Sequence, residues 1–299
     1  MKKKPLTIFG LLAFTIVILA LAAPSILHAL GIHPEYDGPT YALPGKKALI
    51  IGTNHGVLSK PDETTGDPTG VAASEFTHPY YGFLDAGMDV DVASINGGNI
   101  PVDPQTLGRM LITPEDKRYL DDPILQGKIK NSIKIDDIDF TQYDAIFIAG
   151  GWGAAYDLGY SDKLGKKIAE AYYAKTPVIG SVCHGALGLI RAKDEDGKPI
   201  IAGRKATGVS DKQVKELGID VTPMHPETEL RKAGALYESS TAFRDLFATH
   251  VVVDNEKRFV TGQNQNSGHV TAHKMMEIIS KLPKVKAPVN KPVKEDVEG

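Results

Sequence analysis

The sequence predicts an α/β protein with a mostly parallel sheet, and two features of the chain favour that fold class. Short apolar runs that end in small or polar residues recur along the chain, as in "KALIIGT" and "DAIFIAGG". This is the pattern of strands that are buried on both faces of a sheet. Amphipathic stretches with helical spacing lie between several of the runs. Strands that alternate with helices form a parallel sheet with helices on both faces.

The expected elements follow in chain order. The apolar runs predict strands at 47–53, 89–95, 144–151, 177–182, 249–254 and 258–262. The amphipathic stretches predict helices at 74–87, 162–175 and 268–282, the first with Ser74 as its N-cap. A loop at 58–70 and a long insert at 96–140 interrupt the alternation, with a short helix expected at 113–122. Residues 254–257 predict a hairpin turn.

Residues 1–32 predict a membrane anchor or a signal segment. Three lysines precede an apolar run of 18 residues, Leu6 to Ala23, which is near the lower limit for spanning a bilayer. An uncleaved anchor is favoured over a cleaved signal peptide, since the apolar part of a signal peptide usually has only about 7–15 residues. The lysines predict that the domain lies outside the cytoplasm. The alternative is a secreted or periplasmic protein cleaved after Ala20-Leu21-Ala22.

The remainder divides into three parts. Residues 33–45 are rich in Pro, Gly and Tyr and predict a linker, residues 46–283 predict one domain, and the polar tail at 284–299 is expected to be disordered. The formal net charge of -3 gives no reason to expect nucleic acid as a partner. The single cysteine excludes an intrachain disulfide and cysteine-rich metal centres.

That single cysteine, Cys183, lies where a predicted strand meets a predicted helix, in "TPVIGSVCHGALGLI". Ligands of open α/β sheets bind beyond the carboxyl ends of the strands. The small neighbours Ser181 and Gly185 permit the tight turn that raises a nucleophile above a sheet. A helix N-terminus at this point would lower the pKa of the thiol. The alternative is a structural role, in which the cysteine only fills space in the hydrophobic core.

Backbone groups near Cys183 could stabilise an oxyanion. His184 would contribute its N–H group from the same turn. Gly150 and Gly151 follow the neighbouring strand and could contribute another N–H donor. These residues complete a candidate site for nucleophilic catalysis.

The segments "AGGWGAAYDL", "PVIGSVCHGALGLI" and "TGVAASEFTHPYYGFLDAGMDVDVASINGG" together resemble the ThiJ/PfpI family of the class I glutamine amidotransferase-like superfamily, in particular its chaperone and glyoxalase III branch. The resemblance extends over 46–282 and implies a flavodoxin-like three-layer sandwich. It also implies a reactive Cys183, a glutamate beside it that corresponds to Glu75, a homodimer and no cofactor. Without the resemblance, Glu75 reads as an ordinary acid in the first turn of a helix.

The sequence departs from the family pattern at several positions. Relatives often complete a triad with an acid, but the matching position here is Val214. Asp211, Glu216 and Glu227 are the nearby candidates for that acid. Other relatives carry histidine at Trp152 and proline at Gln265, so the shape of the substrate does not transfer. The distal histidine of true glutamine amidotransferases has no evident counterpart.

Histidines deserve separate consideration, since some relatives hold zinc with histidines and a glutamate. His55, His78 and His225 show no recognisable ligand spacing. A lone histidine usually serves packing or surface polarity. The sequence therefore predicts no metal site.

The favoured function is a cysteine-dependent, glyoxalase III-like conversion of small 2-oxoaldehydes to 2-hydroxy acids. The alternatives are a membrane-anchored stress chaperone with an apolar patch on the insert at 96–140, a thiol redox sensor, and an amidase or amidotransferase-like hydrolase. The expected partner in the leading case is a small molecule.

Overall fold

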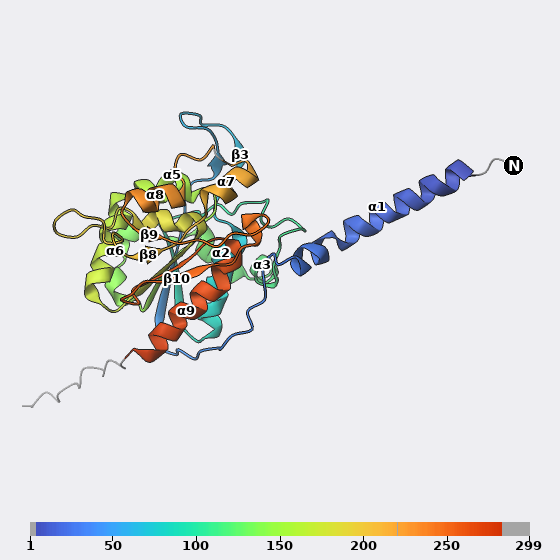
Figure 1. Cartoon of the computed structure of the whole chain (residues 1–299). Coiled ribbons are helices and arrows are strands. Elements are labelled where there is room, and N and C mark those ends of the chain that lie inside the picture. The colour runs from blue at the N-terminus through green and yellow to red at the C-terminus, as the bar shows by residue number, and fades with distance from the viewer. Residues whose placement is uncertain (1–3, 220, 283–299) are drawn as a thin grey trace, which may run out of the picture.

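A seven-stranded sheet forms the centre of the computed structural model, which describes residues 4–219 and 221–282 (Figure 1). The strand order is β10-β11-β7-β6-β1-β4-β5, and only β10 and β11 pair antiparallel. The strands are β1 (Lys47–Gly52), β4 (Asp89–Ser94), β5 (Ile133–Lys134), β6 (Ala145–Ile148), β7 (Val178–Val182), β10 (Val251–Val253) and β11 (Phe259–Gly262). Two small sheets pair β2 (Val57–Leu58) with β3 (Asp67–Pro68), and β8 (Lys205–Ala206) with β9 (Leu236–Tyr237). The predicted mostly parallel α/β fold is confirmed.

Helices cover both faces of this sheet. The α-helices are α1 (Lys4–Ala29), α2 (Ala73–Asp85), α3 (Pro114–Leu120), α4 (Pro123–Lys130), α5 (Ala154–Asp157), α6 (Asp162–Ala174), α7 (Asp211–Leu217), α8 (Pro226–Lys232) and α9 (Gly268–Lys281). The 3₁₀ helices are η1 (Ile135–Asp137), η2 (Phe140–Gln142), η3 (Leu158–Tyr160), η4 (Cys183–Leu189), η5 (Asp245–Phe247) and η6 (Gln265–Ser267).

Two hydrophobic cores lie on opposite faces of the sheet. Ile50 of β1 packs into one core, on the side of α2 and α9, and the next residue, Ile51, packs into the other, on the side of α6 and η4. Phe147 and Ile148 of β6 alternate in the same way. Because successive side chains of a strand point to opposite faces, a strand with helices on both sides must be apolar throughout. This explains the continuous apolar runs of the sequence.

The structure corrects some local expectations. Helix α2 begins at Ala73 with Ala72 as its N-cap, so Ser74 lies inside the helix and does not cap it. The insert holds two helices, α3 and α4, and contributes the edge strand β5. Thr113 caps α3 through a capping box with Asp116, which explains where that helix begins.

The predicted membrane segment forms helix α1, which extends away from the domain in Figure 1. Within residues 4–219 and 221–282, none of the helices is long and apolar enough to cross a bilayer. The predicted anchor, and the membrane as a partner, are therefore not supported. The predicted tail at 284–299 lies outside the described residues.

The predicted linker is attached to the domain at its start. Ile32 is buried, and the His33 backbone N–H donates to Asn266 Oδ1 at 2.7 Å. The amide of Asn266 donates in turn to the carbonyl of Gly31 at 2.8 Å. Residues 31–33 therefore pack against η6 and form part of a wall near Cys183.

Candidate active site

The turn after β7 holds Cys183 in a strained conformation. Its φ angle is 55°, in the left-handed region that residues with a side chain rarely adopt. A Cβ at Gly185 would collide with the carbonyl of Ile148, so only glycine permits the chain to leave the turn along this path. The element that follows is the 3₁₀ helix η4 and not an α-helix. The predicted sharp turn is present, with a shorter and tighter helix behind it.

Glu75 lies in the first turn of α2, and its carboxyl group faces the thiol of Cys183. The residue is 2% exposed, and burial raises the pKa of Glu75 to about 8. The thiol of Cys183 and the backbone N–H groups of Gly151 and Gly150 oppose this rise, but burial outweighs them. A carboxyl group with a pKa near neutrality can both accept and return a proton.

Burial also sets the state of the thiol. It raises the pKa of Cys183, and the neighbouring charge of Glu75 raises it further. The backbone N–H groups of His184 and Gly151 lower that pKa, but by less. The expectation of a lowered thiol pKa is therefore wrong for this geometry. Cys183 and Glu75 form a coupled pair, in which one partner ionises at the expense of the other.

Gly150 and Gly151 bring the backbone against this pair. A Cβ on Gly150 would contact Glu75 Oε2 and lie 2.9 Å from Cys183 Cβ. Gly151 has a φ of 96°, and a Cβ there would collide with backbone atoms of Ala72 and Gly70. The turn after β6 can therefore direct its N–H groups at the reacting atoms, as the predicted oxyanion site requires.

We expect Gly150→Ala to reduce turnover about a hundredfold, since displacement of reacting groups by ~1 Å can cost that much. The added methyl group must displace Glu75, Cys183 or the turn itself. Gly127→Ala is the matched control, because no atom lies within 4 Å of the position a Cβ would take there and the residue lies in helix α4. Wild-type turnover in purified, folded Gly150→Ala would contradict the importance of this close approach.

His184 lies beside the thiol but lacks an orienting acid. Its Nδ1 atom is 3.5 Å from Cys183 Sγ, and its Nε2 atom has no hydrogen-bond partner within the described part of the chain. The ring of Trp152 packs edge-on at 5.0 Å. Burial, together with nearby His225, lowers the pKa of His184 to about 3, so its imidazole is neutral.

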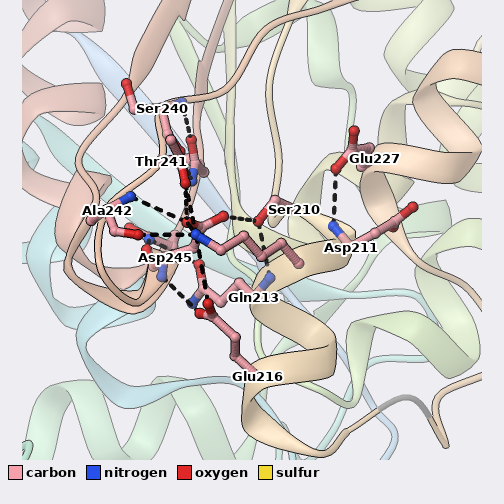
Figure 2. A network of polar contacts seen from close by, with 12 residues as sticks. Ser210, Asp211, Gln213, Glu216, Glu227, Ser240, Thr241, Ala242 and Asp245 are labelled. Carbon is pink, nitrogen blue, oxygen red and sulfur yellow. Dashed lines mark hydrogen bonds and ion pairs between the residues drawn. The ribbon is translucent and has the colours of Figure 1, made fainter.

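None of the three candidate acids reaches His184. The carboxylate of Asp211 accepts a hydrogen bond from the Thr228 hydroxyl. Glu227 accepts from the backbone N–H of Asp211 at 3.0 Å (Figure 2). Glu216 accepts from the backbone N–H of Asp245 at 2.8 Å. Val214, which the family resemblance matches to the position of the acid, is buried. The described residues therefore provide a Cys–Glu pair with an adjacent neutral histidine, without a third acid.

The pair opens into a cavity of about 240 Å³. Glu75, Cys183, Gly151 and Trp152 line it together with residues that the sequence did not single out, namely Ile32, His33, Asp103, Gln105 and Gln213. Gln265, noted as a departure from the family pattern, also lines it. A larger hollow of about 920 Å³ near Tyr172 and Arg258 contains none of the predicted catalytic residues. We take the smaller cavity as the candidate active site, because buried Glu75, with its raised pKa, faces the thiol of Cys183 there.

The histidines considered as metal ligands separate in space. His55 stacks on Tyr156 with ring centroids 4.1 Å apart. His225 precedes α8 and approaches His184. His78 lies one turn after Glu75 on α2 and faces Glu115 and His269, which the sequence did not mark.

Comparisons with known proteins agree with this geometry. Residues 68–277 match the DJ-1/PfpI family. The chain belongs to the DJ-1/PfpI family. The mostly parallel sheet with helices on both faces agrees with a DJ-1/PfpI fold.

Several known proteins resemble this chain over most of its length. Glyoxalase 3 of Candida albicans is 29% identical over 76% of this chain and 95% of its own length. A glutathione-independent glyoxalase of Saccharomyces cerevisiae is 28% identical, over 78% of this chain and 98% of its own length. Among solved structures, the Rapid Encystment Protein 24 kDa of Francisella tularensis aligns with a TM-score of 0.71 and 33% identity over 78% of this chain and 99% of its own. Glyoxalase III of Candida albicans aligns with a TM-score of 0.69 and 27% identity over 78% and 96%.

Proposed function

We propose that this protein is a glutathione-independent glyoxalase that converts 2-oxoaldehydes, such as methylglyoxal, to 2-hydroxy acids through Cys183. One observation carries the proposal: the thiol of Cys183 faces a glutamate whose pKa is raised to about 8, inside a small cavity. The names of several relatives at 27–29% identity support the reaction class. The reaction requires no cofactor and no nucleic acid.

The first step is addition of the thiol to the aldehyde. Sγ of Cys183 bonds to the aldehyde carbon, and its proton passes to ionised Glu75. The new oxyanion lies near the backbone N–H groups of Gly151 and His184, which face the sulfur. Glu75 returns the proton to this oxygen, and a hemithioacetal results.

The second step moves hydrogen between the two carbons. Glu75 removes the proton from the former aldehyde carbon, and an enediolate forms. Return of that proton to the neighbouring carbon, with transfer of the hydroxyl proton from the first oxygen to the second, gives a thioester of a 2-hydroxy acid. Water then hydrolyses the thioester and regenerates the thiol. The aldehyde carbon is oxidised and the ketone carbon is reduced, so no external oxidant is needed.

Glu75 is better suited than His184 to carry this proton. A base works best when its pKa lies near the working pH. The pKa of Glu75 is raised to about 8, whereas that of His184 is lowered to about 3. His184 can still relay a proton between oxygens as a neutral imidazole, since its Nε2 atom has no hydrogen-bond partner among the described residues.

We expect turnover to rise with pH through about 8. Both pKa values of the pair are raised, so at lower pH both groups hold their protons and no base is available. Between pH 8 and pH 6 the ionised fraction of a group with a pKa of 8 falls about fiftyfold, and kcat/KM should follow. A flat profile of kcat/KM between pH 6 and pH 8 would contradict Glu75 as the base.

The experiment that tests the function follows methylglyoxal by proton NMR in buffer without glutathione. Formation of lactate supports the proposal, and consumption without lactate contradicts it. Cys183→Ala distinguishes the enzyme from a chaperone, since a holdase would still suppress the aggregation of other proteins without this thiol. Amide hydrolysis is less favoured, because no acid orients His184 as a base within the described residues. The predicted homodimer stays a prediction.

A further inference from the structure

Histidines gather at a second place in the fold, outside the active-site cavity. His28, His33, His78, His269 and His273 line a hollow of about 670 Å³. The whole chain has nine histidines, so more than half of them meet here. They come from α1, the segment after it, α2 and α9.

Three side chains within this hollow converge on one point. The potential ligand atoms of His78, Glu115 and His269 all lie within 4.8 Å of one another. His78 Nε2 is 3.6 Å from Glu115 Oε2, and His269 Nε2 is 3.6 Å from Glu115 Oε1. These three residues belong to α2, α3 and α9, and we refer to them as the His–Glu–His cluster.

A simple ion pair does not account for the cluster. Pairing of Glu115 with His269 would leave His78 unexplained, since its Nδ1 and Nε2 atoms both lack a hydrogen-bond partner within the described part of the chain. His78 is only 2% exposed, and buried polar atoms in proteins are almost always partnered. Its ring stacks on His269 at 3.7 Å, so both imidazoles present Nε2 to the same carboxylate.

We propose that His78, Glu115 and His269 form a binding site for one divalent transition metal ion, with Zn²⁺ as the best match. Two imidazoles and a carboxylate are a common ligand set for zinc with one open position. Ligand atoms about 2.0–2.1 Å from a tetrahedral ion lie roughly 3.3 Å apart. The 3.6 Å distances from the two imidazoles to the Glu115 carboxylate need only a small contraction, and all three ligand atoms already lie within 4.8 Å of one another.

The proposed ion would join three helices of the same face of the sheet. Helices α2 and α9 pack against each other, and α3 packs on α2. Glu75 and His78 lie one turn apart on α2, while His33 lines both the hollow and the active-site cavity. The ion would thus fix the helix that carries Glu75 and the segment over the cavity, without entering the reaction.

The test titrates the metal-free full-length protein with Zn²⁺ by isothermal calorimetry, and with Co²⁺ by visible absorption. We expect one equivalent to bind, with the Co²⁺ bands of four-coordinate nitrogen and oxygen ligation. His78→Gln and His269→Gln should weaken affinity at least about a hundredfold, since even residues that only support a ligand cost 10–100-fold. Glu115→Gln is the least disruptive variant, because the side chain of Glu115 is 26% exposed.

Two control variants separate other sources of binding. His55→Gln removes a histidine that lies outside the hollow, and Cys183→Ser removes the one thiol. Both should bind Zn²⁺ as the wild type does. Absence of a stoichiometric site in the wild type, full binding by folded Glu115→Gln and His269→Gln together, or loss of binding in Cys183→Ser would each overturn the assignment.

Discussion

Glu75→Gln is expected to reduce turnover of methylglyoxal at least about a thousandfold, within the range that general acid–base groups contribute. The amide keeps the shape of the side chain but cannot accept the proton from the thiol or from the aldehyde carbon. The change therefore removes the shuttle and leaves the cavity in place. Steady-state kinetics of both proteins at pH 8 measure the effect.

The same variant should be folded, because the buried carboxyl group costs stability. A group whose pKa rises from 4.5 unfolded to about 8 folded contributes stability below the lower value and loses it as pH rises toward the higher one. The free energy of unfolding of the wild type should fall relative to Glu75→Gln by roughly 1.4 kcal/mol per pH unit across that window. Urea unfolding at pH 5 and pH 8 checks this sign. Full turnover in Glu75→Gln would refute the proton shuttle.

Cys183→Ser is expected to lose measurable turnover, since a serine hydroxyl lacks the nucleophilicity of a thiolate and is too weak an acid for Glu75, with its pKa of about 8, to ionise. We expect the stability to change by less than about 1 kcal/mol, because the substitution nearly conserves volume and shape. The backbone strain at φ 55° is common to both proteins. Thermal unfolding and product formation by NMR separate loss of function from loss of fold.

A second variant, Ser181→Ala, tests whether the loss of activity in Cys183→Ser is chemical. Ser181→Ala changes a buried residue two positions before Cys183, whose hydroxyl has no hydrogen-bond partner in the described structure. It should retain most activity if the effect of Cys183→Ser is chemical. Equal losses in both variants would instead indicate that the turn is merely sensitive to substitution.

Much of the fold follows from local patterns. The strands could be predicted because the sheet is buried on both faces, so that Ile50 and Ile51 both had to be apolar. The position of Cys183 at the carboxyl edge followed from the small residues around it. The partner of that cysteine, Glu75, came only from the family resemblance, since a first-turn glutamate is common in helices.

Other features depend on packing that no local pattern reveals. The raised pKa of the thiol results from burial, and Ile32 and His33 line the cavity into which the thiol opens. The His–Glu–His cluster joins residues that are far apart in the sequence, so no ligand spacing marks it. The sequence has Val214 where the family resemblance places the triad acid, so the lack of an acid there could be predicted. Only the structure shows that Asp211, Glu216 and Glu227 have other partners.

The central claim is that Cys183 carries the reaction, and its uniqueness in the chain permits a direct test. Iodoacetamide is added to the wild-type protein at pH 8, and samples are taken over time. Peptide mass spectrometry gives the alkylated fraction of Cys183, and NMR gives the rate of lactate formation from methylglyoxal without glutathione. The account predicts that the rate of lactate formation falls linearly with the alkylated fraction of Cys183 and reaches zero at complete alkylation. Undiminished lactate formation by fully alkylated protein would contradict it.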